Sequence, residues 1–209
     1  MKKQIWKNIP WALSVFYILL LYFLPEKIIT GDYTPTQTVL DEWIPFCAPF
    51  VIPYLLWFPG LAAEGVRLLF KEGTGFRQYM LYLLLAYSLA ALIYVFFPNG
   101  QDLRPALDNP QGIFEWMLSL IYAVDTNTNV CPSLHVLGGM AVMFAVCTDK
   151  TEKKPMKLCA CLFFAAVSVS TVFVKQHAVV DVAAGLFAGT LLYVPVYRFR
   201  VLNTETPLS

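Results

Sequence analysis

Six long apolar stretches, each close to the length that crosses a bilayer, most narrowly limit what this chain can fold into. Lipid offers no hydrogen-bond partners to a backbone, so a spanning stretch must satisfy its own polar groups by forming a helix. The sequence therefore predicts an all-α membrane protein, with six transmembrane helices in one integral membrane domain, residues 1–209. The predicted spans cover roughly residues 9–25, 43–60, 79–97, 133–148, 156–174 and 178–197.

Charged residues are sparse in this chain. They make up 14% of the 209 residues, whereas soluble domains are nearer a quarter charged. The basic residues come in short groups between apolar stretches rather than on one face, which gives no indication of nucleic-acid binding. The first apolar stretch ends in "YFLP", residues 22–25, without the small residues of a cleavage site, so we expect an uncleaved first span.

The longest polar segment, residues 98–132, is predicted to be a loop on the outer side of the membrane. Within it, residues 112–124 ("GIFEWMLSLIYAV") are predicted to form an amphipathic helix that lies on the membrane surface.

The distribution of basic residues predicts the orientation. The positive-inside rule favours a multi-pass protein of the cell membrane with both termini in the cytoplasm. Three basic residues, Lys27, Arg104 and Lys175, then lie outside, and twelve of the 15 lie inside. The twelve are Lys2, Lys3, Lys7, Arg67, Lys71, Arg77, Lys150, Lys153, Lys154, Lys157, Arg198 and Arg200.

The chain has only two histidines, and this topology brings both to the extracytoplasmic face. His135 lies just inside the fourth predicted span, and His177 lies at the start of the sixth. An ionisable residue at membrane depth is costly and is therefore a candidate functional residue. Both lie near the positive end of a helix dipole, and two such ends directed at one place favour an anion such as phosphate.

His177 and Asp181 are four residues apart and share one face of a helix. A carboxylate that accepts a hydrogen bond from one imidazole nitrogen orients the ring and leaves the other nitrogen free to attack. The alternative is a polar contact between helices that only supports packing. His135 is a candidate proton donor, because the pKa of a histidine is ordinarily near neutrality. Its alternative is a buried, neutral, hydrogen-bonded histidine.

Three more residues are candidate phosphate ligands. Ser133 is expected to cap the fourth span, and its hydroxyl and the adjacent free amides can bind phosphate oxygens; an ordinary helix cap is the alternative. Arg104 and Lys175 can neutralise phosphate charge. The alternatives are a solvated loop arginine and a lysine that reaches a lipid headgroup.

The chain resembles the type 2 phosphatidic acid phosphatase superfamily, whose fold is shared with vanadium haloperoxidases. The signature of that family is K-x6-R-P, then P-S-G-H, then S-R-x5-H-x3-D. Here "RP" is residues 104–105, "PSLH" is residues 132–135, and "STVFVKQHAVVD" is residues 170–181. Phe97, Leu134 and Thr171 stand where the family has lysine, glycine and arginine. These departures look more like the branch that contains inositol phosphorylceramide synthases.

The resemblance implies a metal-independent, cofactor-independent enzyme that acts on a lipid phosphate or diphosphate. His177 would form a phosphohistidine, with Asp181 orienting its ring and His135 acting as acid and then base. Arg104, Lys175 and Ser133 would stabilise phosphate charge. Water as acceptor gives a phosphatase, and an alcohol as acceptor gives a lipid phosphotransferase. The sequence does not indicate an oligomeric state.

Asp125, Asn127 and Asn129 precede the fourth span. They can line the mouth of the site or bind an acceptor hydroxyl, and a plain polar turn is the alternative. The odd number of cysteines, five, argues against a complete disulfide framework. Cys47 and Cys131 both lie towards the predicted outer face, which leaves a bridge between them open.

Two other functional classes compete with phosphoryl transfer. Cys131, His135, His177 and Asp181 offer metal ligands, although neighbouring cations would repel a metal. A transporter or a lipid-binding scaffold is the non-enzymatic alternative, since intramembrane His and Asp can relay protons. The chain lacks the internal symmetry that is typical of transporters.

Overall fold

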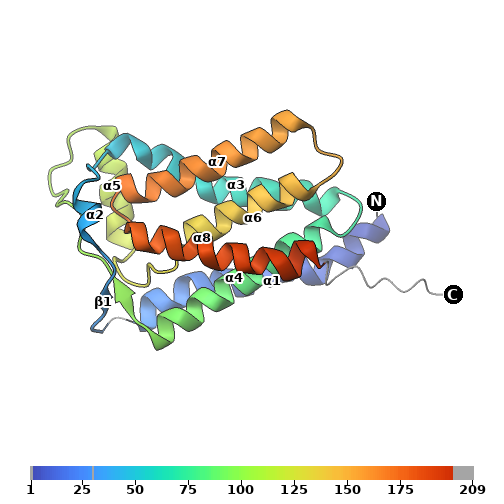
Figure 1. Cartoon of the computed structure of the whole chain (residues 1–209), viewed down its shortest axis with the longest axis horizontal. Coiled ribbons are helices and arrows are strands. Elements are labelled where there is room, and N and C mark those ends of the chain that lie inside the picture. The colour runs from blue at the N-terminus through green and yellow to red at the C-terminus, as the bar shows by residue number, and fades with distance from the viewer. Residues whose placement is uncertain (1, 30, 200–209) are drawn as a thin grey trace.

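The computed structural model describes residues 2–29 and 31–199, in which helices pack side by side along one long axis (Figure 1). The long helices are α1 (Lys2–Ile28), α3 (Val51–Phe70), α4 (Gly75–Phe96), α6 (Leu134–Thr148), α7 (Lys154–Phe173) and α8 (Val179–Tyr193). A π-helical turn, η2 (Val194–Arg198), continues α8. The remaining elements are α2 (Val39–Glu42), the 3-10 turn η1 (Ala48–Phe50), α5 (Ile113–Val124) and two short strands. The predicted all-α membrane fold is confirmed.

Helix α6 lies at the centre of the bundle and packs against α3, α4, α7 and α8. Eleven of its fifteen residues are buried, because it is apolar around its whole circumference. Its two consecutive glycines allow this close packing. A Cβ atom on Gly138 would lie 2.5 Å from Nε1 of Trp57, and one on Gly139 would lie 3.2 Å from the ring of Phe164.

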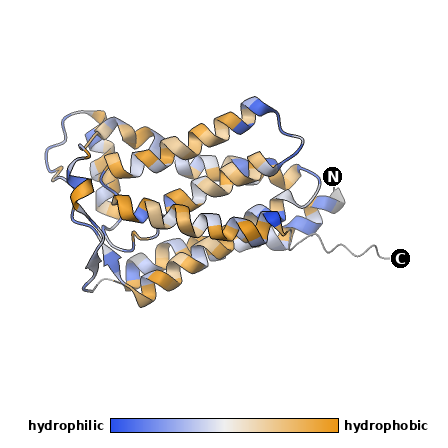
Figure 2. Ribbon diagram, viewed as in Figure 1, coloured by the Kyte–Doolittle hydropathy of each residue, from blue (hydrophilic) through white to orange (hydrophobic). Residues whose placement is uncertain are grey.

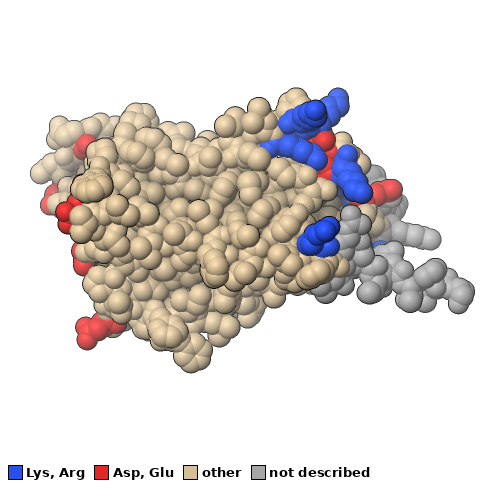
Figure 3. Space-filling view, in the orientation of Figure 1, with Lys and Arg blue, Asp and Glu red and all other residues tan. Residues whose placement is uncertain are grey.

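Within the described residues, five helices are long and apolar enough to cross a membrane, and α6 is shorter. Figure 2 shows that apolar residues cover the waist of the molecule, and Figure 3 shows the Lys and Arg side chains of the visible face gathered at the end that bears the termini. This separation of charge is the pattern from which the orientation was predicted. Arg200, one of the twelve basic residues in that prediction, lies outside the described residues.

The second apolar helix differs most from its predicted range. It was expected over 43–60, and α3 instead covers Val51–Phe70. Pro45 and Pro49 keep the chain before it irregular, whereas Pro59 is accommodated inside the helix. The prediction stopped before the charged pair Glu64 and Arg67, which bond to each other at 2.7 Å and are therefore tolerated near the membrane.

A small clip of backbone hydrogen bonds joins three loops at the opposite end of the bundle. Strand β1 (Thr34–Pro35) pairs in parallel with β2 (Asn99–Gly100), and Gly100 also bridges to Thr128. Glycine is needed there, because a Cβ atom on Gly100 would lie 2.6 Å from the ring of Tyr33. The clip fixes the loops that surround the histidines.

Candidate active site

The two histidines, which are 42 positions apart in the sequence, meet inside the bundle. Nε2 of His177 lies 3.4 Å from Nδ1 of His135, and both side chains are buried. Nδ1 of His177 lies 3.5 Å from Oδ2 of Asp181, which also accepts a hydrogen bond from the backbone N–H of Ala178 at 2.8 Å. The order Asp181, His177, His135 is thus a continuous row of ionisable groups.

The start of α6 is fixed against the start of α8. The Ser133 hydroxyl caps α6 by accepting a bond from the N–H of Val136 at 3.4 Å. The N–H of Ser133 donates to the carbonyl of Asp181 at 3.1 Å. This backbone bond joins the segment that carries His135 to the segment that carries His177.

The turn between α7 and α8 presents His177. The carbonyl of Thr171 accepts bonds from the N–H groups of Gln176 and His177, at 3.0 and 3.1 Å. Lys175 takes the left-handed conformation, with φ at 54°, which few residues other than glycine adopt. The fully buried Gln101 donates to the carbonyl of Lys175 at 2.9 Å and holds this turn from the opposite loop.

The Lys175 ammonium points away from the histidines. It donates to the carbonyls of Asp41 and Ile44, at 2.9 and 2.5 Å. The Asp41 carboxylate in turn accepts a bond from the N–H of Val179, at the start of α8. Lys175 was expected to bind phosphate, but the structure does not bring its ammonium to His177; instead it anchors the turn to α2. Burial lowers the pKa of Lys175, and the nearby Asp41 opposes this shift.

Arg104 lies beside the site and organises its loops. Its guanidinium donates to the carbonyl of Asp125 at 2.7 Å, to the carbonyl of Thr126 and to Oε1 of Gln176. It also lies over the ring of Tyr122, 4.7 Å from the centroid. Arg104 therefore places a fixed positive charge next to the residue that precedes His177.

Two cavities meet at His135. The smaller, of about 30 Å³, is bounded by both histidines and has space for about one water molecule. A phosphoryl group between the rings would therefore require them to separate. Leu134, at the position where the resembled family has glycine, lines this cavity with its own side chain. The other lining residues are Tyr22, Tyr94, Asp125, Thr126, Thr128, Asn129, Val130 and Gln176.

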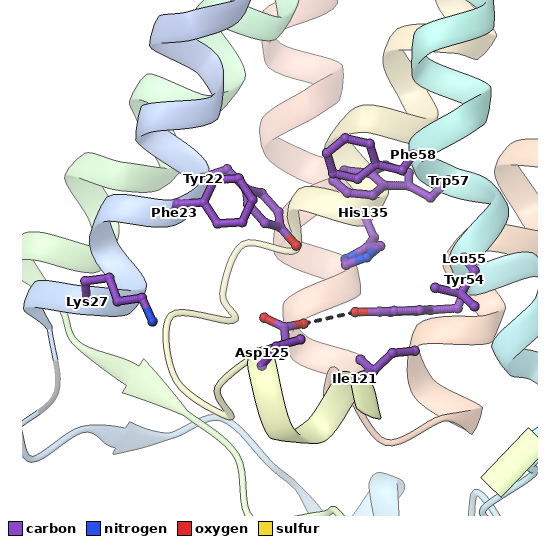
Figure 4. A pocket seen from close by; sticks show the side chains of 11 residues that line it. Tyr22, Phe23, Lys27, Tyr54, Leu55, Trp57, Phe58, Ile121, Asp125 and His135 are labelled. Atoms are coloured by element: carbon purple, nitrogen blue, oxygen red, sulfur yellow. Dashed lines mark hydrogen bonds between the residues drawn. The ribbon is translucent and has the colours of Figure 1, made fainter. Parts of the chain in front are cut away.

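The larger cavity, of about 330 Å³, lies between α1, α3 and the end of α5 (Figure 4). Aromatic side chains dominate its lining, with Tyr22 and Phe23 from α1 facing Trp57 and Phe58 from α3. Its remaining lining residues are Lys27, Tyr54, Leu55, Ile121, Val124, Asp125 and His135. The cavity is thus mainly apolar, with a few polar groups on one side.

The His135 ring lies between two aromatic rings of α3 (Figure 4). Tyr54 stacks on it with centroids 4.3 Å apart, and Trp57 lies 4.2 Å away at 37°. The hydroxyl of Tyr54 donates to Oδ2 of Asp125 at 3.2 Å. These contacts hold the His135 ring between the two aromatic side chains.

The three polar residues before α6 occupy different places. Asp125 lines both cavities, and burial raises the pKa of its carboxyl group, an effect that Arg104 and Tyr54 oppose. Asn129 lines the smaller cavity, and its amide points to backbone carbonyls at the end of α1. The Asn127 amide instead donates to the carbonyl of Gln101 at 2.7 Å and supports the loops.

Cys131 is close to Asp181. Burial and the neighbouring Asp181 carboxylate raise the pKa of its thiol to about 12, so it stays protonated at neutral pH. Cys47 and Cys131 are both free, and the bridge that the sequence left open is not formed. The described residues contain no group of three or more His, Cys, Asp or Glu side chains that is arranged to hold a metal ion.

Two of the three departures from the resembled signature have a structural explanation. Phe97 ends α4 and is 72% exposed on the outside of the bundle. Thr171 is fully buried, and its hydroxyl donates to the carbonyl of Ser168 at 2.8 Å. Neither position carries a charge that could reach the histidines.

A family model matches residues 75–205, which is more than half of the chain, and its description is "PAP2 superfamily". The chain belongs to the PAP2 superfamily. No match was found among curated proteins or among solved structures. Members of the superfamily are phosphatases or phosphotransferases that act on phosphorylated substrates, and the chain has the helices of a multi-pass membrane protein.

Sequence reasoning missed several residues of the site. Tyr54 and Trp57 are three positions apart on α3, a spacing that places both on one helical face. No pattern in the sequence indicates that this face points to His135, because the two aromatic residues lie in an unbroken apolar stretch. Asp41 and Gln101 were detectable only as isolated polar residues in loops, and the structure buries both completely.

Proposed function

We propose that this PAP2 protein is a membrane phosphatase that hydrolyses a lipid phosphate or diphosphate at the extracytoplasmic face. The observation that carries the proposal is the buried row of Asp181, His177 and His135, with 3.5 and 3.4 Å between successive partners. Two imidazoles at this spacing can supply a nucleophile to a phosphorus atom and a proton donor to the oxygen atom that leaves it. The adjoining apolar cavity supports a lipid as the substrate.

In the first proposed step, Nε2 of His177 attacks phosphorus and the bond from phosphorus to the lipid oxygen breaks. His135 donates a proton to the departing oxygen. Asp181 stabilises the positive charge that forms on the His177 ring. In the second step, water attacks the phosphohistidine, His135 takes its proton, and inorganic phosphate leaves. Ser133, the free amides of α6, and Arg104 stabilise charge on the phosphoryl oxygens. The proposed reaction uses no metal or cofactor.

The role proposed for Lys175 differs from the one predicted from the sequence. The sequence placed it among the phosphate ligands, and its contacts with α2 support a role in holding the turn that carries His177. Its ammonium already donates two hydrogen bonds to carbonyls, those of Asp41 and Ile44. Phosphate binding by Lys175 therefore requires that turn to rearrange.

A lipid phosphotransferase is the second candidate function. Asp125, paired with Tyr54 and lining both cavities, is suited to accept a hydrogen bond from an alcohol. An acceptor hydroxyl held there would replace water in the second step. Asn129, which lines the smaller cavity, is a further candidate contact for such an acceptor. Asn127 lies in the same loop, where its amide donates to the carbonyl of Gln101.

The decisive experiment uses purified protein in detergent with a panel of lipid phosphates and diphosphates, with and without polyol acceptors. Free phosphate and new phospholipids are both measured. We expect phosphate release that His177→Ala abolishes, together with an acid-labile phosphoenzyme that the same variant cannot form. Full turnover by His177→Ala would refute the proposal. A requirement for an added metal that chelator removes would favour the metal-dependent alternative.

The proposed orientation has its own test. Single cysteines in a cysteine-free variant, one near Lys153 and one near Asn109, are labelled in intact cells with a membrane-impermeant maleimide. Labelling near Asn109 alone supports cytoplasmic termini and an extracytoplasmic site. Labelling near Lys153 alone would reverse the orientation.

A further inference from the structure

A second apolar cavity lies next to the one at His135. It has a volume of about 290 Å³ and lies between α1, α3 and α4. Tyr22, Trp57 and Phe58 line both cavities. These three aromatic side chains therefore form the boundary between the candidate active site and the second cavity, which we call the α1–α3 groove. The Tyr22 ring lies 5.9 Å from that of Trp57 and 6.3 Å from that of Phe58.

The α1–α3 groove extends along the helices away from the histidines. Its walls include α1 from Ala12 to Tyr22 and α3 from Trp57 to Leu69. At 1.5 Å per residue these segments are about 15 and 18 Å long. The hydrocarbon of one leaflet is about half of the 30 Å core, so the groove has about the depth of a single leaflet.

The lining of the groove is suited to hydrocarbon. Apart from Tyr, Trp and Met80 side chains, every lining residue is aliphatic, glycine or phenylalanine. Small residues keep it open: Ala12, Ala62 and Gly65 all lie in its walls, and a Cβ atom on Gly65 would meet only Tyr79, at 3.6 Å. A charged headgroup would lose its hydration there without gaining a charged partner.

The groove is also open to the bilayer along one side. Val15, Phe58 and Val66 lie in its walls and are 41, 48 and 57% exposed. In a membrane, these exposed apolar side chains face lipid. A lipid can therefore reach the groove sideways between α1 and α3, without leaving the hydrocarbon layer.

We infer that one hydrocarbon chain of the substrate occupies the α1–α3 groove while its phosphate lies at His135 and His177. The substrate class is then a phosphate ester of a long-chain lipid, bound with its chain directed from the histidines towards the middle of the membrane. This inference rests on the proposed function for the site, and on the shared wall of the two cavities for the place of the chain. A chain that enters the groove from the site would displace the aromatic side chains of that wall.

The first test measures kcat/KM for monomeric alkyl phosphates of increasing length, from butyl to dodecyl, with purified protein. Each methylene that moves from water into the groove should raise kcat/KM by up to about fourfold. The variants form a matched pair of neighbours on α3. Both alanines are exposed, but Ala62 lines the groove and Ala63 does not, so Ala62→Phe adds a ring at the groove and Ala63→Phe adds the same ring elsewhere.

We expect Ala62→Phe to reduce the ratio of dodecyl to butyl kcat/KM at least tenfold, and Ala63→Phe to keep the wild-type ratio. Gly65→Leu, which fills the floor of the groove, should act like Ala62→Phe and serves if that variant does not fold. Equal ratios in the wild type, Gly65→Leu and Ala62→Phe would overturn the inference while leaving the phosphatase proposal intact.

The second test does not depend on turnover. Hexadecyl phosphate with a diazirine at mid-chain is photolysed with the His177→Ala protein, and adducts are mapped by mass spectrometry. Adducts on groove residues that unlabelled hexadecyl phosphate displaces, and hexadecanol does not, would support the inference even if no phosphatase activity is found. Adducts spread over the outer helix faces, or displaced equally by hexadecanol, would show only non-specific lipid contact and overturn it.

Discussion

Nε2 of His177 lies 3.4 Å from Nδ1 of His135, and this contact places a potential nucleophile and a potential proton donor on the same side of one small cavity. The other nitrogen of His177 faces Asp181, so the two nitrogens of one ring have separate partners. The roles proposed for the two histidines therefore differ, and variants can separate them.

Replacing His135 should lower the reaction rate most for substrates whose leaving group must be protonated as it departs. Loss of a general acid typically lowers the rate by about 10²–10⁴-fold. We expect His135→Ala to lose that much with an alkyl phosphate and much less with p-nitrophenyl phosphate, whose leaving group departs without protonation. Comparing the rate of phosphoenzyme formation for the two substrates measures this, because the second step, in which His135 acts as base, is common to both. Equal losses in that first step would mean that His135 only binds or positions the substrate there.

Asp41 should act as a positioning residue for the turn that presents His177. Asp41→Ala removes the acceptor of the Val179 N–H and a partner of the Thr38 N–H, which costs about 1–2 kcal/mol. We expect the melting temperature to fall by about 2–8 °C, and kcat to fall while KM changes little. Calorimetry in detergent and steady-state kinetics measure both. The exposed neighbour Glu42 gives the control, since Glu42→Ala should alter neither quantity.

Asp125 should make stability depend on pH in a predictable direction. Burial raises the pKa of Asp125 above 3.8, so the folded state holds this proton more tightly than the unfolded chain does. Stability must then decrease as the pH rises from the ordinary carboxyl value through the raised one. We expect Asp125→Asn to match the wild type below that window and to melt at a higher temperature above it. A variant that is less stable at neutral pH would contradict the raised pKa.

Glu152 should show the opposite pH dependence at the other end of the molecule. The hydrogen bond from Lys71 lowers the pKa of Glu152, and Arg67 acts in the same direction. Its stabilising effect should be present at neutral pH and be lost as the pH falls below its ordinary value of 4.5. We expect Glu152→Gln to lower the melting temperature by at most about 3 °C at pH 7. High salt should shrink this difference, and no difference at low salt would mean the network contributes nothing.

Structural features that depend on a single segment of the chain could be predicted from the sequence. The apolar stretches predicted the helices, and the spacing of His177 and Asp181 predicted a shared face, because helical geometry relates residues that are close in the chain. Ser133 was recognised as a helix cap for the same reason. Contacts between distant segments were not readable. The direction of the Lys175 side chain depends on a left-handed turn and on carbonyls of α2, more than 130 positions away.

Hydropathy also misplaced one boundary for a physical reason. The prediction ended the second span at residue 60, before the charged residues Glu64 and Arg67. The structure pairs those charges with each other and pairs Arg67 with Glu152, so the helix continues to Phe70. The contacts of Tyr54 and Trp57 with His135 could not be predicted, because an apolar stretch has the same pattern whether its aromatic side chains face lipid or a histidine ring.

The bond from Lys175 to the carbonyl of Asp41 joins positions 134 residues apart, and this has a consequence for biosynthesis. A chain that emerges from the ribosome from its N-terminus inserts α1 to α4 long before the α7–α8 turn exists. The histidines can be brought to their working positions only after nearly the whole polypeptide is in the membrane. Nascent and prematurely terminated products should therefore be catalytically silent, which confines any hydrolysis of membrane lipids to the finished protein.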